Sequence, residues 1–80
     1  MSARIVDARN LLCPLPVIRT QDAVAECRPG DELQVLCTDP GVIHDIPAWC
    51  RVHGHAVGEI RHEDRDIVIS ICVGEMEGKT

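Results

Sequence analysis

The chain has 80 residues, of which 45% are hydrophobic and 26% charged, and 8 basic against 13 acidic side chains give a net charge of −5. A chain of this length buries roughly 60% of its unfolded surface, which is enough for one thin core. The negative charge repels phosphate backbones and no basic stripe offsets it, so we expect no direct binding to nucleic acid. With no Phe, no Tyr and one Trp, the core must be aliphatic.

The N-terminal residues and the cysteines together indicate a cytoplasmic protein. The N-terminal segment lacks the apolar stretch of a secretory signal, and no run of about eighteen apolar residues occurs, so we expect no membrane association. The 5 cysteines are odd in number and include no C-x-x-C pair, which argues against a disulfide scaffold. In a reducing compartment most of them should be small buried hydrophobic residues.

The N-terminal half of the chain predicts a strand, a helix and a second strand. A short strand over Ala3–Asp7 ends at turn residues, and a turn at Arg28–Asp31 leads into a strand over Glu32–Thr38. Between them, apolar residues recur at helical spacing from Pro14 to Cys27, which predicts an amphipathic helix. Two prolines in its first turn are compatible, because the first N–H groups of a helix have no intrahelical partner. The residues expected on its apolar face are Val17, Ile18, Val24 and Cys27.

A second helix is predicted after Asp39 and Pro40, which suit the N-cap and the first helical position. Apolar residues recur at helical spacing beyond them, and Gly54 suits the C-terminus of the helix. Pro47 cannot lie in an undisturbed helix interior. We therefore expect this helix either to kink or to restart with Asp45 as a second cap.

Two strands complete the chain. The patterns over Ala56–Arg61 and Asp66–Val73 predict strands joined by a turn at His62–Arg65, and the residues from Gly74 to Thr80 are expected to form a mobile tail. The element order predicts an α/β fold, a two-layer sandwich in which two helices cover one face of a four-stranded mixed sheet. We expect residues 1–80 to form a single domain.

Cys13 is the cysteine in a different setting, because Pro14 follows it at the start of the first predicted helix. A residue before proline is pushed toward extended backbone angles, which an N-cap needs. The unpaired N–H groups and the positive end of the helix dipole there favour a thiolate and should lower the pKa of the Cys13 thiol. We therefore interpret Cys13 as a reactive nucleophile. The alternative of a small buried capping residue stays open, because C-P-x-P alone is a weak signal.

Several short motifs place Cys13 in a wider context. C-P-L-P at residues 13–16 follows the first strand, P-G-D at 29–31 precedes the second, and T-D-P at 38–40 and D-I-P-A-W-C at 45–50 follow it. In this order and spacing the motifs resemble the TusA/SirA family of small sulfur carriers over nearly the whole chain. The resemblance implies a sulfurtransferase in which Cys13 accepts sulfane sulfur and holds it as a persulfide.

The resemblance also implies protein partners. The sulfur donor would be a cysteine desulfurase or a rhodanese-like protein, and the acceptor would be another carrier that serves tRNA thiolation or sulfur oxidation. Asn10 stands where the family often has Gly, and since Asn tolerates left-handed angles we expect the turn to be preserved. Gln21 and Asp22 stand where basic residues are common in the family. The residues expected to contact partners are Leu12, Pro14, Leu15, Pro16, Arg19, Asp39 and Asp45.

Two groups of polar residues also have other interpretations. Asp39 and Asp45 can each serve as a helix cap. Cys50, His53 and His55 form C-x-x-H-x-H, which invites a zinc interpretation. A structural zinc site needs four ligands, so we expect neither a metal nor any other cofactor.

The remaining cysteines and the single tryptophan are expected to pack in the core, namely Cys27, Cys37, Cys72 and Trp49. The main alternative function is a thiol-independent adaptor or regulator whose acidic surface and Trp49 region bind a basic partner. A redox or metal-binding module is a third possibility, with little support in the residues. Nothing in the chain demands more than a monomer.

Overall fold

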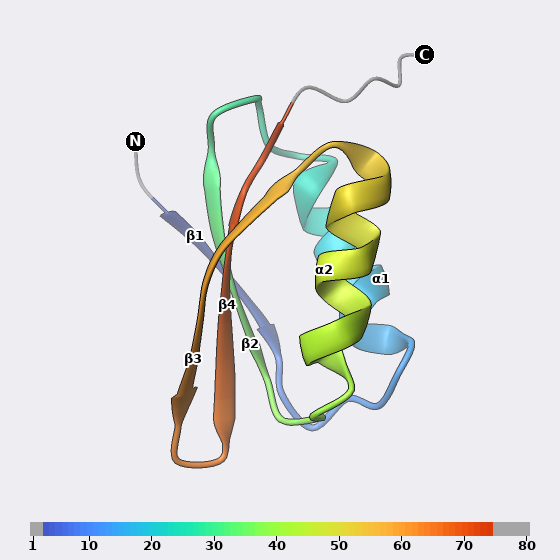
Figure 1. Cartoon of the computed structure of the whole chain (residues 1–80), viewed down its shortest axis with the longest axis vertical. Coiled ribbons are helices and arrows are strands. Elements are labelled where there is room, and N and C mark those ends of the chain that lie inside the picture. The colour runs from blue at the N-terminus through green and yellow to red at the C-terminus, as the bar shows by residue number, and fades with distance from the viewer. Residues whose placement is uncertain (1–2, 75–80) are drawn as a thin grey trace.

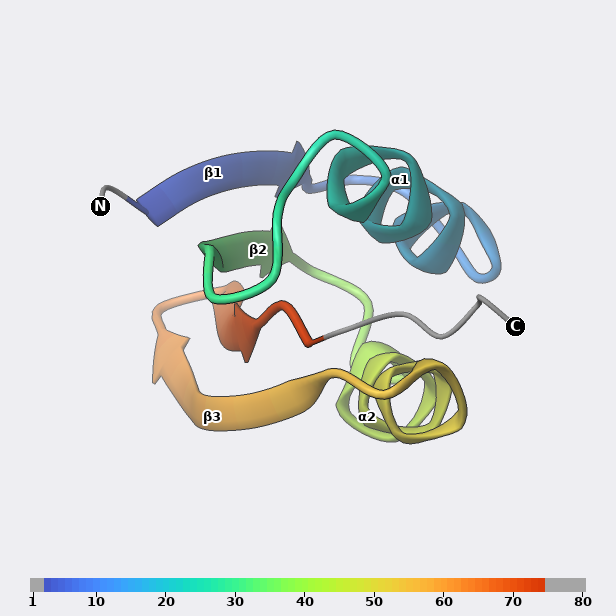
Figure 2. The same cartoon turned by 90° about the horizontal axis from the view of Figure 1, so that it is seen from above.

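The computed structural model describes residues 3–74, which form a sheet of four strands with both helices on one of its faces (Figures 1 and 2). This confirms the predicted element order and the two-layer α/β sandwich. The predicted mobile tail lies outside the described residues except for Gly74, whose N–H donates to Nδ1 of His55 at 3.0 Å. The elements are β1 (Ala3–Ala8), α1 (Leu15–Val24), β2 (Glu32–Cys37), α2 (Val42–His53), β3 (Ala56–Glu63) and β4 (Asp66–Cys72).

The sheet has the strand order β1-β2-β4-β3, and β1 runs parallel to β2 while the other neighbours are antiparallel. In the parallel pair, Ala8 at the end of β1 lies opposite Cys37 at the end of β2. The segments that follow these two strands therefore start side by side at one edge of the sheet. That edge is where the candidate site forms.

The core lies between the sheet and the two helices. Every second residue of a strand points to the same face, so β2 and β4 each bury one row of side chains under the helices. Each helix buries residues four apart, which lie on one face. The buried rows are Leu33, Val35 and Cys37 of β2, Ile67, Ile69 and Ile71 of β4, Pro16, Thr20 and Val24 of α1, and Val42, Ile46 and Cys50 of α2.

The second helix begins at Val42, with Gly41 as its N-cap, and continues through Pro47 to His53. The predicted restart at Asp45 is therefore wrong. Pro47 costs the helix one backbone hydrogen bond, because its nitrogen carries no hydrogen for the carbonyl four residues earlier. Gly54 ends the helix with a φ of 82°, which confirms the predicted C-terminus.

Two other predicted boundaries were also wrong. Helix α1 ends at Val24, and the chain up to Cys27 forms tighter turns in which N–H groups bond carbonyls three residues back. The β3–β4 hairpin is closed by Asp64 and Arg65 alone, so β3 runs to Glu63 and is longer than expected, whereas β4 ends at Cys72, one residue earlier than expected. Asp64 adopts a φ of 57°, which Asp tolerates better than most residues.

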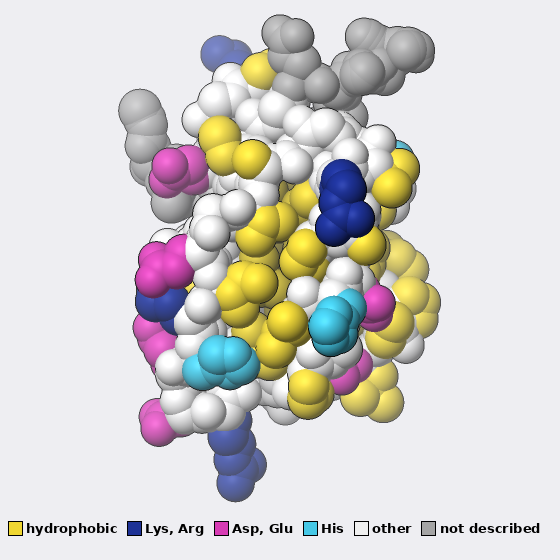
Figure 3. Space-filling model, in the orientation of Figure 1, with side chains coloured by type: hydrophobic (Ala, Val, Ile, Leu, Met, Phe, Trp, Pro, Cys, Tyr) yellow, Lys and Arg dark blue, Asp and Glu magenta, His cyan; other side chains and the backbone are white. Residues whose placement is uncertain are grey.

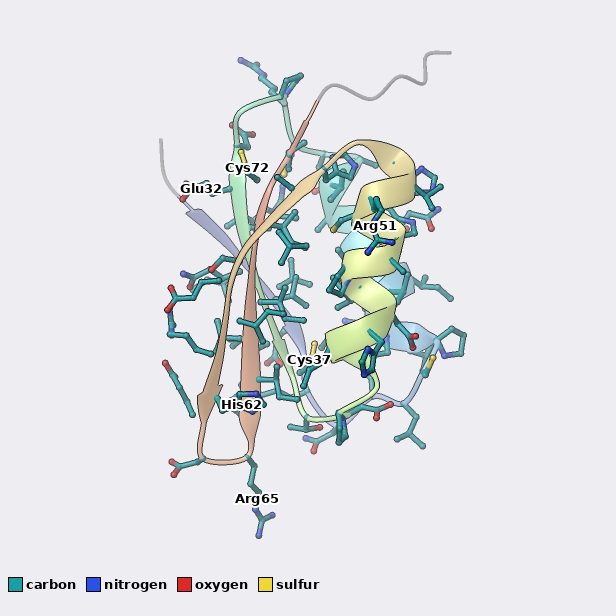
Figure 4. All side chains as sticks on the ribbon, in the orientation of Figure 1. Glu32, Cys37, Arg51, His62, Arg65 and Cys72 are labelled. Carbon is teal, nitrogen blue, oxygen red and sulfur yellow. The ribbon has the colours of Figure 1, made fainter. Side chains whose placement is uncertain are left out.

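All five cysteines are free, and they differ in exposure. Cys37 and Cys50 are buried as expected, and burial raises the pKa of both thiols to about 11. Cys72 is exposed, so its predicted place in the core is wrong. It follows buried Ile71 and therefore points to the sheet face that no helix covers, on the far side of the sheet from Cys37 (Figure 4).

The core reaches the surface beside α2. Figure 3 shows hydrophobic side chains gathered between β3 and α2. The partly buried residues that pack against the core include Ile43 of α2 and Val57 and Ile60 of β3. Trp49 is also partly buried against the core, and its ring stacks with His55 at a centroid distance of 5.3 Å. This confirms Trp49 as a packing residue. None of the helices within residues 3–74 is both long and apolar enough to cross a membrane.

The core row of β4 offers a test of this packing. Ile69→Ala should lower the free energy of unfolding by about 2–5 kcal/mol, because it removes a fully buried side chain at the centre of the sheet. The matched control is Ile5→Ala on β1, since the Ile5 side chain is 64% exposed. The control should change stability by less than about 0.5 kcal/mol in urea titrations. Equal losses in the two variants would contradict the assignment of sheet faces.

Candidate functional site

The loop from β1 into α1 lies against the loop from β2 into α2. Asn10 adopts a φ of 63°, which confirms the left-handed turn expected there. Its N–H donates to Oγ1 of Thr38 at 2.9 Å and so ties the two loops together. Because β1 and β2 are parallel neighbours, the chain after Asn10 passes close to the acidic start of the α2 segment.

Asp39 holds the backbone of the first loop. Its Oδ2 accepts the N–H of Cys13 at 3.1 Å, and its Oδ1 accepts the N–H of Gly41 at 3.1 Å. One carboxylate therefore closes the turn before α2 and fixes the position of Cys13. Asp39 precedes the N-cap Gly41 by two residues, so the prediction that it is the N-cap itself is wrong.

Asp45 holds the side chain of Cys13. The thiol Sγ of Cys13 donates a hydrogen bond to Oδ2 of Asp45 at 2.9 Å. Asp45 lies in the first turn of α2, where a negative charge is favourable. Both carboxylates lie beside Gly41. If residue 41 had a side chain, its Cβ would lie 3.5 Å from Oδ1 of Asp39 and 3.8 Å from Oδ2 of Asp45. We call Asp39 and Asp45 the acidic pair.

The acidic pair reverses the expected effect on the Cys13 thiol. The hydrogen bond to Asp45 raises the pKa of this thiol, and partial desolvation and the charges of both carboxylates act in the same direction. The prediction of a pKa lowered by the helix is therefore wrong. Pro14, joined to Cys13 by a cis peptide bond, is the N-cap of α1, and no side-chain hydrogen bond caps this helix. The N–H of Leu15 donates to the carbonyl of Leu12 at 2.9 Å instead of to sulfur.

Exposed apolar residues lie next to Cys13 in the sequence and on the helix that follows it. Leu12 is 72% exposed, Leu15 46% and Ile18 44%, and we call these three residues the apolar patch. Ile18 was expected on the buried face of α1, but Thr20 is buried there instead. Thr20 satisfies its hydroxyl by donating to the carbonyl of Pro16 at 2.9 Å. The spacing of three between the members of the patch is the signal that sequence reasoning missed.

The other predicted partner-contact residues fall in different places. Pro14 is exposed beside Cys13, whereas Pro16 lies in the first turn of α1 and is buried on its core-facing side, so it cannot contact a partner. Arg19 lines a hollow at the end of β1 together with Arg9 and Asp7. The side-chain hydrogen bonds from Arg9 lower the pKa of Asp7 to about 2, with a smaller contribution from the charge of Arg19.

The zinc interpretation of C-x-x-H-x-H receives no support from the structure. Cys50 is buried in the core, while His53 is exposed and its ring lies 4.8 Å from that of Trp49. Among residues 3–74, no three His, Cys, Asp or Glu side chains come together in a way that could hold a metal ion.

The fold and the site define a class of protein before any comparison is made. It is a small α/β sandwich that presents an exposed thiol on the loop into its first helix, where an acidic pair binds it and exposed apolar residues flank it in the sequence. Such a thiol can meet other molecules at the surface, because Cys13 is exposed. Of the described part of the chain, only Cys72 is a second exposed thiol, and it lies on the open face of the sheet.

Comparisons with known proteins identify the family. The family described as "Sulfurtransferase TusA" matches residues 4–73. A putative sulfur carrier protein of Neisseria meningitidis is 39% identical over 64 residues, which cover 80% of this chain and 86% of that protein. The sulfur carrier protein TusA of Pseudomonas paraeruginosa is 41% identical over 59 residues, covering 74% of this chain and 75% of the relative.

The crystal structure of a SirA-like protein from Desulfitobacterium hafniense has the same fold. It superposes with a TM-score of 0.79 at 28% identity and covers 92% of this chain and 100% of that one. The chain therefore belongs to the TusA family of sulfurtransferases, and its role is that of a sulfur carrier. A carrier of this kind works between a protein that supplies sulfur and a protein that receives it.

The raised pKa of the Cys13 thiol predicts its reactivity. In a Cys72→Ser variant, Cys13 should become reactive toward iodoacetamide at a higher pH when the protein is folded than when it is unfolded in urea. At neutral pH the folded protein should therefore be alkylated more slowly at Cys13, as followed by peptide mass spectrometry. If the pH midpoint of Cys13 alkylation in the folded protein were at or below that of the unfolded chain, the proposed effect of the acidic pair would be wrong.

Proposed function

We propose that Cys13 carries the sulfur as a persulfide, accepting it from a donor protein and passing it to an acceptor protein. The observation that supports this most is the exposed Cys13 thiol, held in place through both its N–H and its Sγ by residues of a different segment. A relay atom has to be exposed to two partners in turn and yet stay fixed in position. Cys13 combines these two properties.

The transfer conserves atoms and electrons without a cofactor. The Cys13 thiolate attacks the outer sulfur of a donor cysteine persulfide, and a new S–S bond forms at Cys13. The S–S bond of the donor breaks, and its electron pair stays on the donor cysteine as a thiolate. One sulfane sulfur has moved and nothing has been oxidised overall. A thiol of the acceptor repeats the same exchange on the Cys13 persulfide.

The surface around Cys13 is the proposed docking surface for both partners. Leu12, Leu15 and Pro14 supply exposed apolar contacts, and the acidic pair supplies charge for a basic partner. We infer a cysteine desulfurase or a rhodanese-like protein as the donor. The proposal places a monomeric carrier in the cytoplasm, with sulfur bound for tRNA thiolation or for sulfur oxidation.

Mass spectrometry can test the site of the persulfide. After incubation with a sulfane-sulfur donor, the intact protein should gain sulfur, and peptide mapping should place it on Cys13. Cys13→Ser should abolish the gain, while Cys72→Ser, which removes the other exposed thiol, should leave it unchanged. Equal loading of Cys13→Ser would overturn the proposal. Full activity of Cys13→Ser in cells would favour the thiol-independent adaptor instead.

The docking surface makes a separate prediction. Leu15→Ser should raise the KM for the carrier in sulfur transfer from a cysteine desulfurase by roughly tenfold, the effect of losing one well-buried contact worth about 1–2 kcal/mol. Loading by a small inorganic polysulfide should be unchanged, because it needs no docking. Val52→Ser is the matched control, since Val52 is a 78% exposed apolar residue on α2. An equal effect of both variants would refute the docking surface.

A further inference from the structure

The acidic pair has no cationic partner within the part of the chain that the structure describes. The ion pairs among residues 3–74 join Arg4 to Glu26, Arg9 to Asp7 and Asp66, and Arg61 to Glu59 and Glu63. None of them includes Asp39 or Asp45. These two carboxylates instead accept hydrogen bonds from Cys13 and Gly41, and they leave their negative charge beside the sulfur that has to react.

We propose that Asp45 keeps Cys13 as a hydrogen-bonding thiol in the free carrier, and that a lysine or arginine of a partner protein frees the sulfur by taking over this carboxylate. This inference rests on the proposed persulfide function. It adds a role for Asp45 and a chemical requirement for the partners. Cys13 becomes a nucleophile in the docked complex, and stays a poor one in free solution.

The geometry shows how the thiol is held and how it can be released. The 2.9 Å contact requires the proton to lie between Sγ and Oδ2, because two anions would repel each other at that distance. A cation that binds Oδ2 removes the hydrogen-bond acceptor and cancels a negative charge at the same time. The thiol proton then passes to water, and the thiolate attacks the donor persulfide as described above.

The same molecule shows what a guanidinium does to a carboxylate of this kind. Arg9 donates two side-chain hydrogen bonds to Asp7, each at 2.9 Å, and this pairing holds the pKa of Asp7 at about 2. An arginine or lysine delivered to Asp45 would occupy its oxygens in the same way. A partner's cation can reach this site because Cys13 is exposed. The first turn of α1 has no acidic side chain that would compete with Asp45 for the cation.

Among residues 3–74, the charged groups that act on the Cys13 sulfur belong to the α2 segment. From the α2 segment these are Asp45, through its hydrogen bond and its charge, and Asp39 through its charge. The only base on α1 is Arg19, which lines the hollow near Asp7 at the end of β1. Replacing Asp45 should therefore change the pH at which the Cys13 thiol loses its proton.

The first experiment compares Asp45→Asn with Asp22→Asn, a change of equal charge at an exposed position on α1. The Asn amide keeps the size of the side chain and removes the charge. Alkylation of Cys13 by neutral iodoacetamide at pH 7 should become several-fold faster in Asp45→Asn, and its pH midpoint should fall. Asp22→Asn should match the parent chain. An unchanged pH profile in Asp45→Asn would overturn the proposal.

The second experiment tests the requirement for a cation without any partner protein. Cystamine carries two ammonium groups and bis(2-hydroxyethyl) disulfide carries none, and each exchanges with the Cys13 thiolate to give a mixed disulfide and a released thiolate. The rate ratio of cystamine to the neutral disulfide should exceed the ratio measured for free glutathione. It should fall in Asp45→Asn and at high salt, which screens exposed charges. A rate ratio that stays the same both in Asp45→Asn and at high salt would overturn the proposal.

These readouts separate this inference from the proposed function. If sulfur loads onto Cys13 but neither the pH profile nor the charge preference depends on Asp45, only the role of Asp45 fails. If no sulfur loads onto Cys13, the persulfide function fails whatever Asp45 does. The salt dependence is measured on the parent chain, so it stands even if Asp45→Asn does not fold.

Discussion

The two carboxylates that hold Cys13 are the contacts on which the rest of the site depends. Asp39 binds the Cys13 N–H and Asp45 binds its sulfur, across 26 and 32 residues of sequence. These contacts exist because β1 and β2 are parallel neighbours whose ends meet at one edge of the sheet. The sheet thus sets the position of the loop, and the loop sets the direction of the thiol. The apolar patch of Leu12, Leu15 and Ile18 does not pack in the core and stays exposed.

In the proposed function, this arrangement lets Cys13 hold sulfur without reacting outside a complex. A low thiol pKa would make Cys13 reactive toward any electrophile, whereas the acidic pair raises that pKa and keeps the exposed thiol protonated. A carrier that moves between proteins benefits from such restraint, because transfer is then confined to complexes with the right partner. The cost is a slower intrinsic reaction, which docking has to offset.

Much of the fold and part of the site could be predicted from the sequence. Local rules correctly predicted the element order, the left-handed Asn10 and the helix end at Gly54. They failed where contacts between distant segments decide the outcome. The bond from Cys13 to Asp45 outweighs the helix start, and neither residue reveals the other by its spacing. Cys72 was wrongly predicted to be buried. The alternation of residues along β4 is as expected, but helices cover only one face of the sheet and Cys72 lies on the other.

The protonation state of Cys13 in the free carrier tests this account most directly. Infrared spectra at neutral pH of the parent chain and of Cys13→Ser should differ by one S–H stretching band, because the variant removes one thiol. The account predicts that this band is present and lies at a lower frequency than in a variant in which Asp45→Ala has removed the acceptor. The absence of any Cys13 S–H band, which would mean a thiolate, would contradict it.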